Sequence, residues 1–232
     1  MNSISKRIVY QSDACIVVNK LPGEAVEGAR DRTVDLPCLL AQHTGGNQPV
    51  AVHRLDVPVS GCCLFARVPE TRAFLSAAFA KSLIEKRYWA IVEKPPSSIP
   101  PERELLHYIQ IDLKHNKSVA YTEASPGRKK ALMRYQLVGS GERYLFLEIE
   151  LLSGRHHQIR AQLARECLRV KGDLKYGARR SEPNGGIRLH AHLLAFPDPS
   201  GNGKTIRASA LPPLMDRLWE AFVACIAETR SI

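Results

Sequence analysis

The chain has 232 residues, 44% of them hydrophobic and 24% charged, which is the balance of a folded globular protein and excludes a disordered chain. We expect neither a signal peptide nor a membrane span near the N-terminus, because the apolar run at 15–18 stops at Asn19 and Lys20. The formal net charge of +10 favours partners that carry phosphate groups, although many proteins without such partners are also basic.

The six cysteines and the basic residues are both unevenly placed. The cysteines stand at 15, 38, 62, 63, 167 and 225 without a C-x-x-C pair, which is typical of reduced thiols in a cytoplasmic protein. Eight basic residues lie between 154 and 180, opposed by two acidic ones, and an Arg-Lys-Lys cluster occupies 128–130. With two histidines and Tyr176 nearby, the first cluster suits an RNA-binding groove better than a solvated surface.

The first half of the chain predicts short strands alternating with helices. Apolar segments at 8–10 and 14–18 end at a Leu-Pro-Gly turn and predict a strand pair. Four apolar residues after Pro69 recur at helical spacing, whereas the run at 62–66 is continuously apolar and predicts a buried strand. The expected elements are strands at 8–10, 14–18, 62–66 and 88–92, and helices at 36–42 and 69–79.

The second half predicts a hairpin, two helices and a further strand. The segment 139–142, Gly-Ser-Gly-Glu, separates two strand-like runs and is a strong hairpin signal. The Pro-rich segment 95–101 is the best linker candidate, and a connection within one sheet is equally consistent with it. The expected elements are strands at 131–138, 144–152 and 187–196, and helices at 157–167 and 214–227.

These elements favour an α+β fold. Strands outnumber helices and several are linked as hairpins, so we expect a mixed, mainly antiparallel sheet flanked by helices and loops instead of a doubly wound parallel sheet. The chain contains no internal repeat.

The segment 53–61, His-Arg-Leu-Asp-Val-Pro-Val-Ser-Gly, carries the most chemical information. Its carboxylate, Asp56, precedes a Pro/Gly turn and a buried strand, an arrangement that fixes a side chain on a rigid support at the end of a sheet. Asp56 is therefore a candidate catalytic residue, although most aspartates before a proline only cap a turn.

This segment resembles the H-R-L-D-x-x-T-S-G signature of the RluA family of pseudouridine synthases, and Asp56 matches that family's catalytic aspartate. Val59 stands where the family usually has Thr, Leu21 is an extra residue before Pro22, and His156 replaces a commoner Thr or Ser. Motifs at 13–23, 86–92, 152–160, 172–177 and 189–191 agree in the same order, so the resemblance covers residues 8–196 and is specific. It implies a single pseudouridine synthase catalytic domain over 1–232, with a central RNA-binding cleft.

The implied reaction isomerises uridine in RNA. The N1 glycosidic bond breaks, the base turns, and C5 joins the same sugar carbon without redox change, so no cofactor is expected. Asp56 would attack C1′ or C6, or remove a sugar proton, and the sequence does not choose among these routes. Each route needs an ionised carboxylate in a pocket that excludes water.

The resemblance assigns two further catalytic residues. Burial would raise the pKa of Asp56, and Arg155 is the family-matched cation whose planar guanidinium would hold the carboxylate charged. The alternative for Arg155 is a phosphate contact. Tyr88 matches the active-site tyrosine that stacks on the extruded base, and its alternative is a core tyrosine at a strand start.

Five residues are candidates for RNA binding. Arg54 would fill the vacancy left by a flipped-out uridine, although an exposed arginine is as often part of a surface ion pair. His157 and Gln158 would position Arg155 or bind phosphates, and His53 and Arg160 complete the set. No metal is expected, because the adjacent His156 and His157 should point apart and no carboxylate or thiol stands at ligand spacing.

Three classes of protein compete for this sequence. A catalytically silent RNA-binding protein on the same scaffold is the alternative to the isomerase, and the presence of Asp56, Tyr88 and Arg155 favours the isomerase. A hydrolase would need paired carboxylates or a metal cluster. Because the motifs begin near residue 8, we expect recognition of a stem-loop of tRNA or rRNA without an N-terminal RNA-binding domain. The absence of a long heptad pattern favours a monomer.

Overall fold

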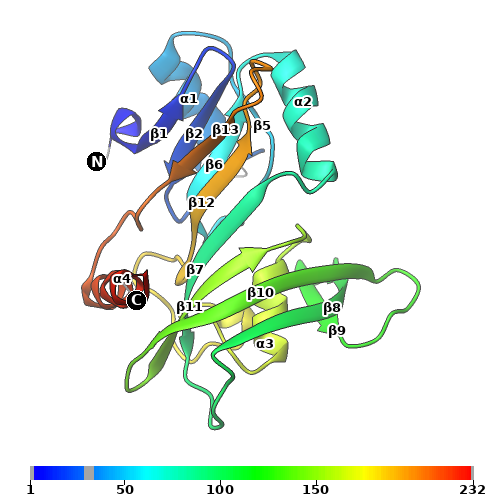
Figure 1. Cartoon of the computed structure of the whole chain (residues 1–232), viewed down its shortest axis with the longest axis vertical. Coiled ribbons are helices and arrows are strands. Elements are labelled where there is room, and N and C mark those ends of the chain that lie inside the picture. Colours follow the sequence, from blue (N-terminus) through cyan, green and yellow to red (C-terminus); the bar gives the residue numbers. More distant parts are fainter. Residues whose placement is uncertain (1–2, 29–33, 231–232) are drawn as a thin grey trace. The chain divides into compact units, whose positions relative to one another are not determined.

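The computed structural model describes residues 3–28 and 34–230, which form two compact units (Figure 1). Unit 1 consists of the described residues up to Lys86 together with His190–Pro213, and unit 2 of Arg87–Leu189 together with the described residues from Leu214. Each unit combines a mainly antiparallel sheet with helices. The expected α+β class is therefore confirmed.

Unit 1 is built on a sheet in the order β1-β2-β6-β12, with β13 beside β12 and β5 beside β6. The β6 and β12 strands run parallel and their neighbours run antiparallel. The elements of the sheet are β1 (Ile8–Gln11), β2 (Cys15–Lys20), β5 (Val50–Ala51), β6 (Ser60–Ala66), β12 (Leu189–Pro197) and β13 (Thr205–Ser209). The others are η1 (Ile4–Arg7), the short pair β3 (Glu24–Ala25) and β4 (Val34–Asp35), and the helices α1 (Leu36–Thr44) and α2 (Pro69–Ala80).

The core of unit 1 explains why β6 is continuously apolar. Every residue of β6 is buried, and Cys62 and Leu64 pack with Leu75 of α2 and with Phe196 of β12 in one cluster. A strand that is covered on both faces does not alternate between polar and apolar residues. The predicted buried strand at 62–66 is thus confirmed.

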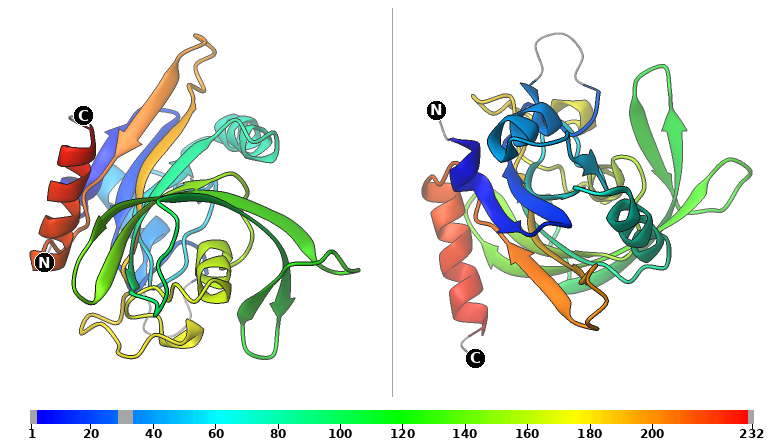
Figure 2. Two further views of the ribbon diagram at one scale, coloured as in Figure 1. Left: turned by 60° about the horizontal axis from the view of Figure 1, so that its bottom comes forward. Right: turned by 90° about the horizontal axis from the view of Figure 1, so that it is seen from above.

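Unit 2 is an antiparallel sheet in the order β7-β11-β10-β8-β9. Figure 2 shows α3 on the concave side of the curved strands. The elements are β7 (Glu85–Glu93), β8 (Glu102–Asp112), β9 (Lys117–Tyr121), β10 (Lys129–Ser140), β11 (Tyr144–Leu151), α3 (Gln158–Arg165), η2 (Leu174–Tyr176) and α4 (Arg217–Arg230). Trp219 and Phe222 of α4 pack against Trp89 and Phe146 on the opposite face from α3.

One open alternative is decided and one helix boundary is corrected. The Pro-rich segment 95–101 connects β7 to β8 within the sheet of unit 2, so of the two alternatives the sheet connection is confirmed. The last helix begins at Arg217 instead of 214, because Asp216 Oδ1 accepts hydrogen bonds from the backbone N–H groups of Leu218 and Trp219 and acts as the N-cap.

Within 3–28 and 34–230, no helix is long and apolar enough to cross a membrane.

Candidate active site

The loop that carries Asp56 lies in unit 1, between β5 and β6. Leu55 and Val59 are buried on either side of the half-buried Asp56, and Val57 is 46% exposed. The backbone N–H of Val59 donates to the Asp56 carbonyl at 3.0 Å, which closes a turn, and the N–H of Gly23 donates to the Val57 carbonyl at 2.8 Å. The apolar anchors and these bonds hold the carboxylate at a fixed place in the loop before β6.

A buried lysine, Lys20, supports the same loop. Its side chain is completely buried, and Nζ donates to the carbonyls of Leu21 and Glu24 at 2.9 Å and of Val57 at 3.0 Å. Burial lowers the pKa of Lys20 to about 8, while the negative charges of Glu24 and Asp56 act to raise it. The ammonium group is therefore a cation that interacts electrostatically with Asp56 and binds the backbone one residue beyond it. The sequence analysis did not identify it.

Gly61 fixes the start of β6. It is paired with Ala191 of the parallel strand β12, and its φ is +117°. A Cβ atom at this position would lie 2.3 Å from the Ala191 carbonyl oxygen, so only glycine fits. Next to it, Ser60 Oγ donates to His190 Nδ1 at 2.9 Å, because His190 Nε2 donates to the carbonyl of Ala210 at the same distance.

His53 and Arg54 differ in their surroundings although they are neighbours. His53 Nε2 accepts a hydrogen bond from the backbone N–H of Leu64 at 3.2 Å, and its ring stacks on Phe79 of α2. Burial, with a smaller effect from Lys86, lowers the pKa of His53 to about 4. His53 therefore anchors the loop to β6 as a neutral ring, and Arg54 beside it is exposed. Contact with RNA stays a prediction for both.

Two neutral histidines should make unit 1 sensitive to mild acid. Burial lowers the pKa of His190 to about 3 and that of His53 to about 4. Below pH 6.5 these histidines are therefore protonated in the unfolded chain and stay neutral in the folded chain. Each histidine should then cost about 2 kcal/mol of unfolding free energy between pH 7 and pH 5. Denaturant titrations at the two pH values should show this loss.

The variant His190→Gln provides the check, because glutamine does not titrate. Its unfolding free energy should fall less between the two pH values than that of the wild type. The matched change at the exposed His43, His43→Gln, should leave the wild-type dependence in place. An identical pH dependence in the His190 variant would contradict the assignment.

Tyr88 lies in unit 2, in the middle of β7. It is 7% exposed and is paired with Ile149 of β11. The neighbouring Trp89 turns to the opposite face, where Nε1 donates to Glu148 at 3.3 Å. The predicted strand at 88–92 is confirmed, and the observed strand β7 is longer, from Glu85 to Glu93.

Arg155 lies in unit 2 on the loop between β11 and α3. It is exposed, and its Nε donates to the Lys130 carbonyl at 3.1 Å. Gln158 holds the loop, because its Oε1 accepts from the Arg155 N–H at 3.0 Å and from Ser153 Oγ at 2.8 Å, while Nε2 donates to the Leu132 carbonyl. Of the two roles expected for Gln158, these contacts favour positioning Arg155.

The two adjacent histidines stack on each other, with ring centroids 3.9 Å apart, so the expectation that they point apart is wrong. The reason is the left-handed backbone of His157, whose φ is +51°, at the start of α3. His157 Nδ1 lies 3.0 Å from the hydroxyl of Tyr176, and His156 Nδ1 lies 2.9 Å from Ser118 Oγ. These contacts tie the Arg155 loop to η2 and β9.

Arg160 is engaged inside unit 2. Its guanidinium is buried and forms a bidentate pair with Asp173, with nitrogen–oxygen distances of 2.7 and 2.8 Å. Such a pair is costly to open, because it would leave a buried charge without a partner. The pair orients α3 against the loop before η2, and RNA binding by Arg160 stays a prediction.

Comparisons with known proteins agree with this description. Residues 14–165 match the family model described as RNA pseudouridylate synthase. An uncharacterized RNA pseudouridine synthase of Zymomonas mobilis is 30% identical over 198 residues, which are 84% of this chain and 89% of that protein. The tRNA pseudouridine synthase C of Haemophilus ducreyi is 29% identical over 92% of each chain. The solved structure of human RNA Pseudouridylate Synthase Domain Containing 4 is similar with a TM-score of 0.73 and 22% identity, over 98% of this chain and 94% of that chain.

The fold is thus that of a pseudouridine synthase, with a mixed, mainly antiparallel sheet and flanking helices. The chain belongs to the RNA pseudouridylate synthase family, whose reaction is an isomerisation. The family inferred from the Asp56 segment is confirmed. The matched region contains Asp56, Tyr88 and Arg155.

Proposed function

We propose that this protein is an RNA pseudouridine synthase that isomerises particular uridines in structured RNA, with residues 1–232 acting as one catalytic domain. The observation that carries the proposal is the Asp56 loop. It lies within the region matched to the family, and a buried lysine and a buried strand hold it in place. A carboxylate on so rigid a support suits attack on a single sugar or base carbon.

We propose Asp56, Tyr88 and Arg155 as the catalytic residues. Asp56 acts on the ribose or the base, the N1–C1′ bond breaks, and C5 bonds to C1′. C5 then loses a proton and N1 gains one, so the product is an isomer and no cofactor is consumed. Tyr88 stacks on the free base, and Arg155 keeps the carboxylate ionised.

RNA binding is proposed for Arg54, His53, His157, Gln158 and Arg160. Arg54 is the strongest of them, because it is exposed and lies two residues before Asp56. A planar cation at this point can stack in the place of a flipped-out base and contact phosphates. His157 and Gln158 act through the Arg155 loop that they hold.

Arg54→Ala should lower the catalytic efficiency on RNA about tenfold or more, by loss of a stacking and phosphate contact. The melting temperature should stay close to that of the wild type, because the exposed side chain contributes little to the core. Steady-state kinetics with a transcribed stem-loop and a thermal melt of the same preparation measure the two effects. Unchanged turnover would remove Arg54 from the mechanism.

The substrate is proposed to be a stem-loop of tRNA or rRNA, and the protein to act as a cytoplasmic monomer without a metal. The relative named tRNA pseudouridine synthase C matches over 92% of both chains. The relative named ribosomal large subunit pseudouridine synthase D matches over 70% of its own length. The match to the first relative over most of both chains supports a tRNA stem-loop as the substrate.

Mapping of pseudouridines in total RNA tests the proposed function. RNA from cells with and without the protein should differ at one or a few uridines, and the purified protein should restore them. A third sample, from cells that carry the Asp56→Asn variant, should match the RNA without the protein. Identical maps in all three samples, with no modification by the purified protein, would refute the function.

A further inference from the structure

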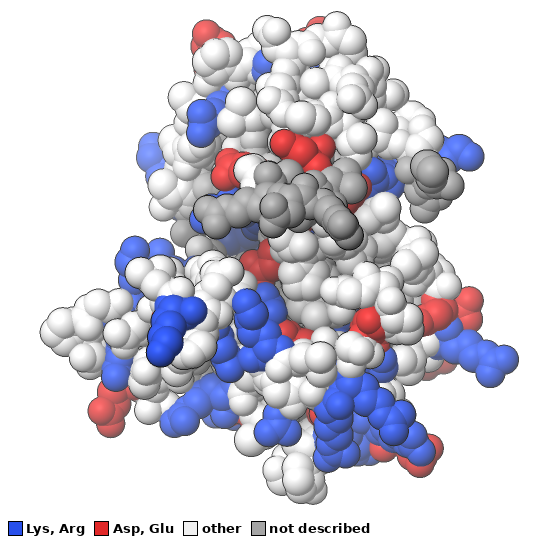
Figure 3. Space-filling model, turned by 180° about the vertical axis from the view of Figure 1, so that it is seen from behind, with Lys and Arg blue, Asp and Glu red and all other residues white. Residues whose placement is uncertain are grey.

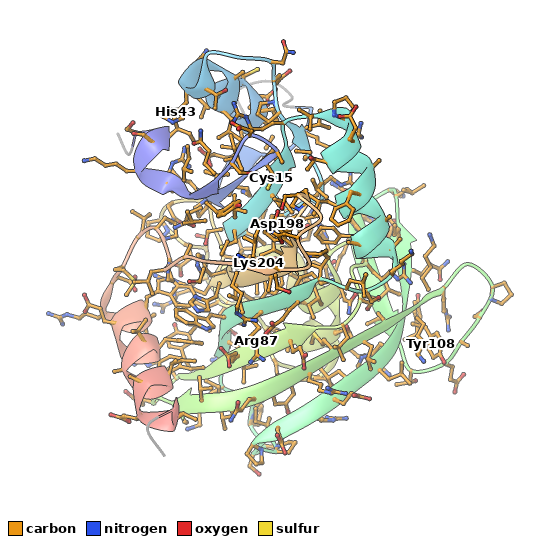
Figure 4. The ribbon with its side chains drawn as sticks, turned by 45° about the horizontal axis from the view of Figure 1, so that its top comes forward. Cys15, His43, Arg87, Tyr108, Asp198 and Lys204 are labelled. Atoms are coloured by element: carbon orange, nitrogen blue, oxygen red, sulfur yellow. The ribbon has the colours of Figure 1, made fainter. Side chains whose placement is uncertain are left out.

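Unit 2 has an exposed sheet surface at the end formed by β8, β9 and β10. We call it the tyrosine face, and it consists of Leu106, Tyr108, Val119, Tyr121 and Lys130. Leu106 is 45% and Val119 39% exposed, both tyrosines are half-buried, and Lys130 is exposed. Figure 4 labels Tyr108 on this part of the sheet. Neighbouring exposed apolar side chains mark a binding site more often than scattered ones do.

The strand register places these side chains on one face. Tyr108 is directly opposite Tyr121 of β9 on one side and Lys130 of β10 on the other. Directly paired residues share a face, and residues two apart along a strand share it as well. The alternate residues, such as Ile109, Ala120 and Ala131, are buried on the other face, where they pack against α3.

Within unit 2, α4 covers the far end of this face. The side chains of α4 pack on Val138 and Phe146, at the end of the sheet near the hairpin between β10 and β11. Between that end and the tyrosine face, Arg134 pairs with Glu104 at 2.9 Å and with Glu150 at 3.5 Å. This exposed ion-pair group separates the apolar core under α4 from the tyrosine face.

The chemistry of the tyrosine face is aromatic and positive. The guanidinium of Arg128 lies over the Tyr121 ring, 3.6 Å from its centroid, so the two planar groups form a stack. Lys129 and Lys130 follow directly and are exposed. Two acidic side chains of β8 are already paired, Asp112 with His115 and Glu104 with Arg134. Figure 3, which views the opposite side of the molecule from Figure 1, shows that Lys and Arg side chains also gather in clusters on that side of unit 2.

We propose that the tyrosine face binds the single-stranded RNA next to the target uridine, which deepens the proposed function and rests on it. Bases stack on Tyr108 and on the Tyr121–Arg128 pair, and Lys130 contacts the phosphates. Aromatic rings and guanidinium planes on an exposed sheet accept bases of any sequence, while cations hold the backbone. The positive charge favours RNA over a protein partner, since an apolar protein surface would leave these cations unpaired.

A direct contact links the tyrosine face to a proposed catalytic residue. The Lys130 carbonyl accepts the hydrogen bond from Arg155 Nε, and Lys130 is the strand neighbour of Tyr108. Adjacent strands are about 4.8 Å apart, so the step from β10 through β8 to β9 spans about 10 Å. Stacked bases repeat at about 3.4 Å, so two or three nucleotides beside the uridine at Arg155 fit on the face.

Paired double variants test this proposal. Tyr108→Leu with Tyr121→Leu keeps two apolar side chains and removes the rings, whereas Tyr108→Phe with Tyr121→Phe keeps the rings. With a fluorescent oligouridylate of about ten nucleotides as the probe, the Leu pair should bind about tenfold or more weakly in an anisotropy titration. The Phe pair should bind within about twofold of the wild type, because stacking does not need the hydroxyl.

Controls separate this proposal from the proposed function. Lys94→Ala changes an exposed lysine elsewhere in unit 2 and should leave binding unchanged. If the folded Leu pair binds the probe with the affinity of the wild type, the tyrosine face is not an RNA site. The same holds if the Leu pair differs from the wild type only in its self-association. A different outcome is that the wild type binds the probe but modifies no RNA, while the Leu pair loses probe binding. That result would overturn the proposed function and leave the tyrosine face as an RNA-binding site.

Discussion

Asp56→Asn is expected to abolish pseudouridine formation, with a loss of roughly 10³-fold or more, because every route for the reaction needs a carboxylate that attacks or removes a proton. The amide keeps the shape of the side chain and removes its charge. The turn should survive, because the Asp56 group that accepts from Val59 is the backbone carbonyl. RNA affinity should therefore stay close to the wild-type value.

The measurement is single-turnover conversion of a transcribed substrate, with RNA affinity and melting temperature from the same preparation. Asp13→Asn is the matched control, since Asp13 is fully exposed and its contact with Arg67, at 3.8 Å, is at the surface. The control should react like the wild type. Turnover by the Asp56 variant at the wild-type rate would disprove the central assignment.

The sequence predicts the buried elements of the fold better than the exposed ones. The run at 62–66 is apolar throughout because β6 is buried on both faces, and the helix at 69–79 shows its spacing because Leu75 and Ala78 face the core. The β8 strand was not predicted, because it begins with Glu-Arg-Glu and alternates buried residues such as Leu105 with exposed ones such as Leu106. A strand that has one exposed face and begins with charged residues gives a weaker pattern.

The same contrast applies to the candidate site. Asp56 and Arg155 are identifiable because each lies in a contiguous motif, and the motif is a property of the sequence alone. The stack of His156 on His157 was not predictable, since it depends on one left-handed backbone conformation. Lys20 could not be identified either, because its role depends on a carbonyl at residue 57, which only folding brings to it.

Lys20→Met should destabilise the protein and slow the reaction together. Methionine fills the space of the lysine stem but leaves the carbonyls of Leu21, Glu24 and Val57 without their shared donor. Unsatisfied buried groups of this kind cost about 1–3 kcal/mol each, so we expect a loss of about 3 kcal/mol or more in unfolding free energy. Denaturant unfolding measures it, and the exposed Lys94→Met should cause little change.

The dependence of turnover on pH separates an electrostatic role of Lys20 from a purely structural one. Its pKa of about 8 in the folded protein means that the ammonium loses its charge as the pH rises through that value. The unfolded lysine stays protonated up to about pH 10.4, so the unfolded chain binds more protons between these values and the unfolding free energy rises with pH there. Turnover of the wild type should nevertheless fall above about pH 8, because the cation near Asp56 disappears.

In a folded Lys20→Met protein, turnover should already be low at pH 7 and should lack this decline. A wild-type decline that persists unchanged in the variant would assign it to another group and leave Lys20 with a structural role only.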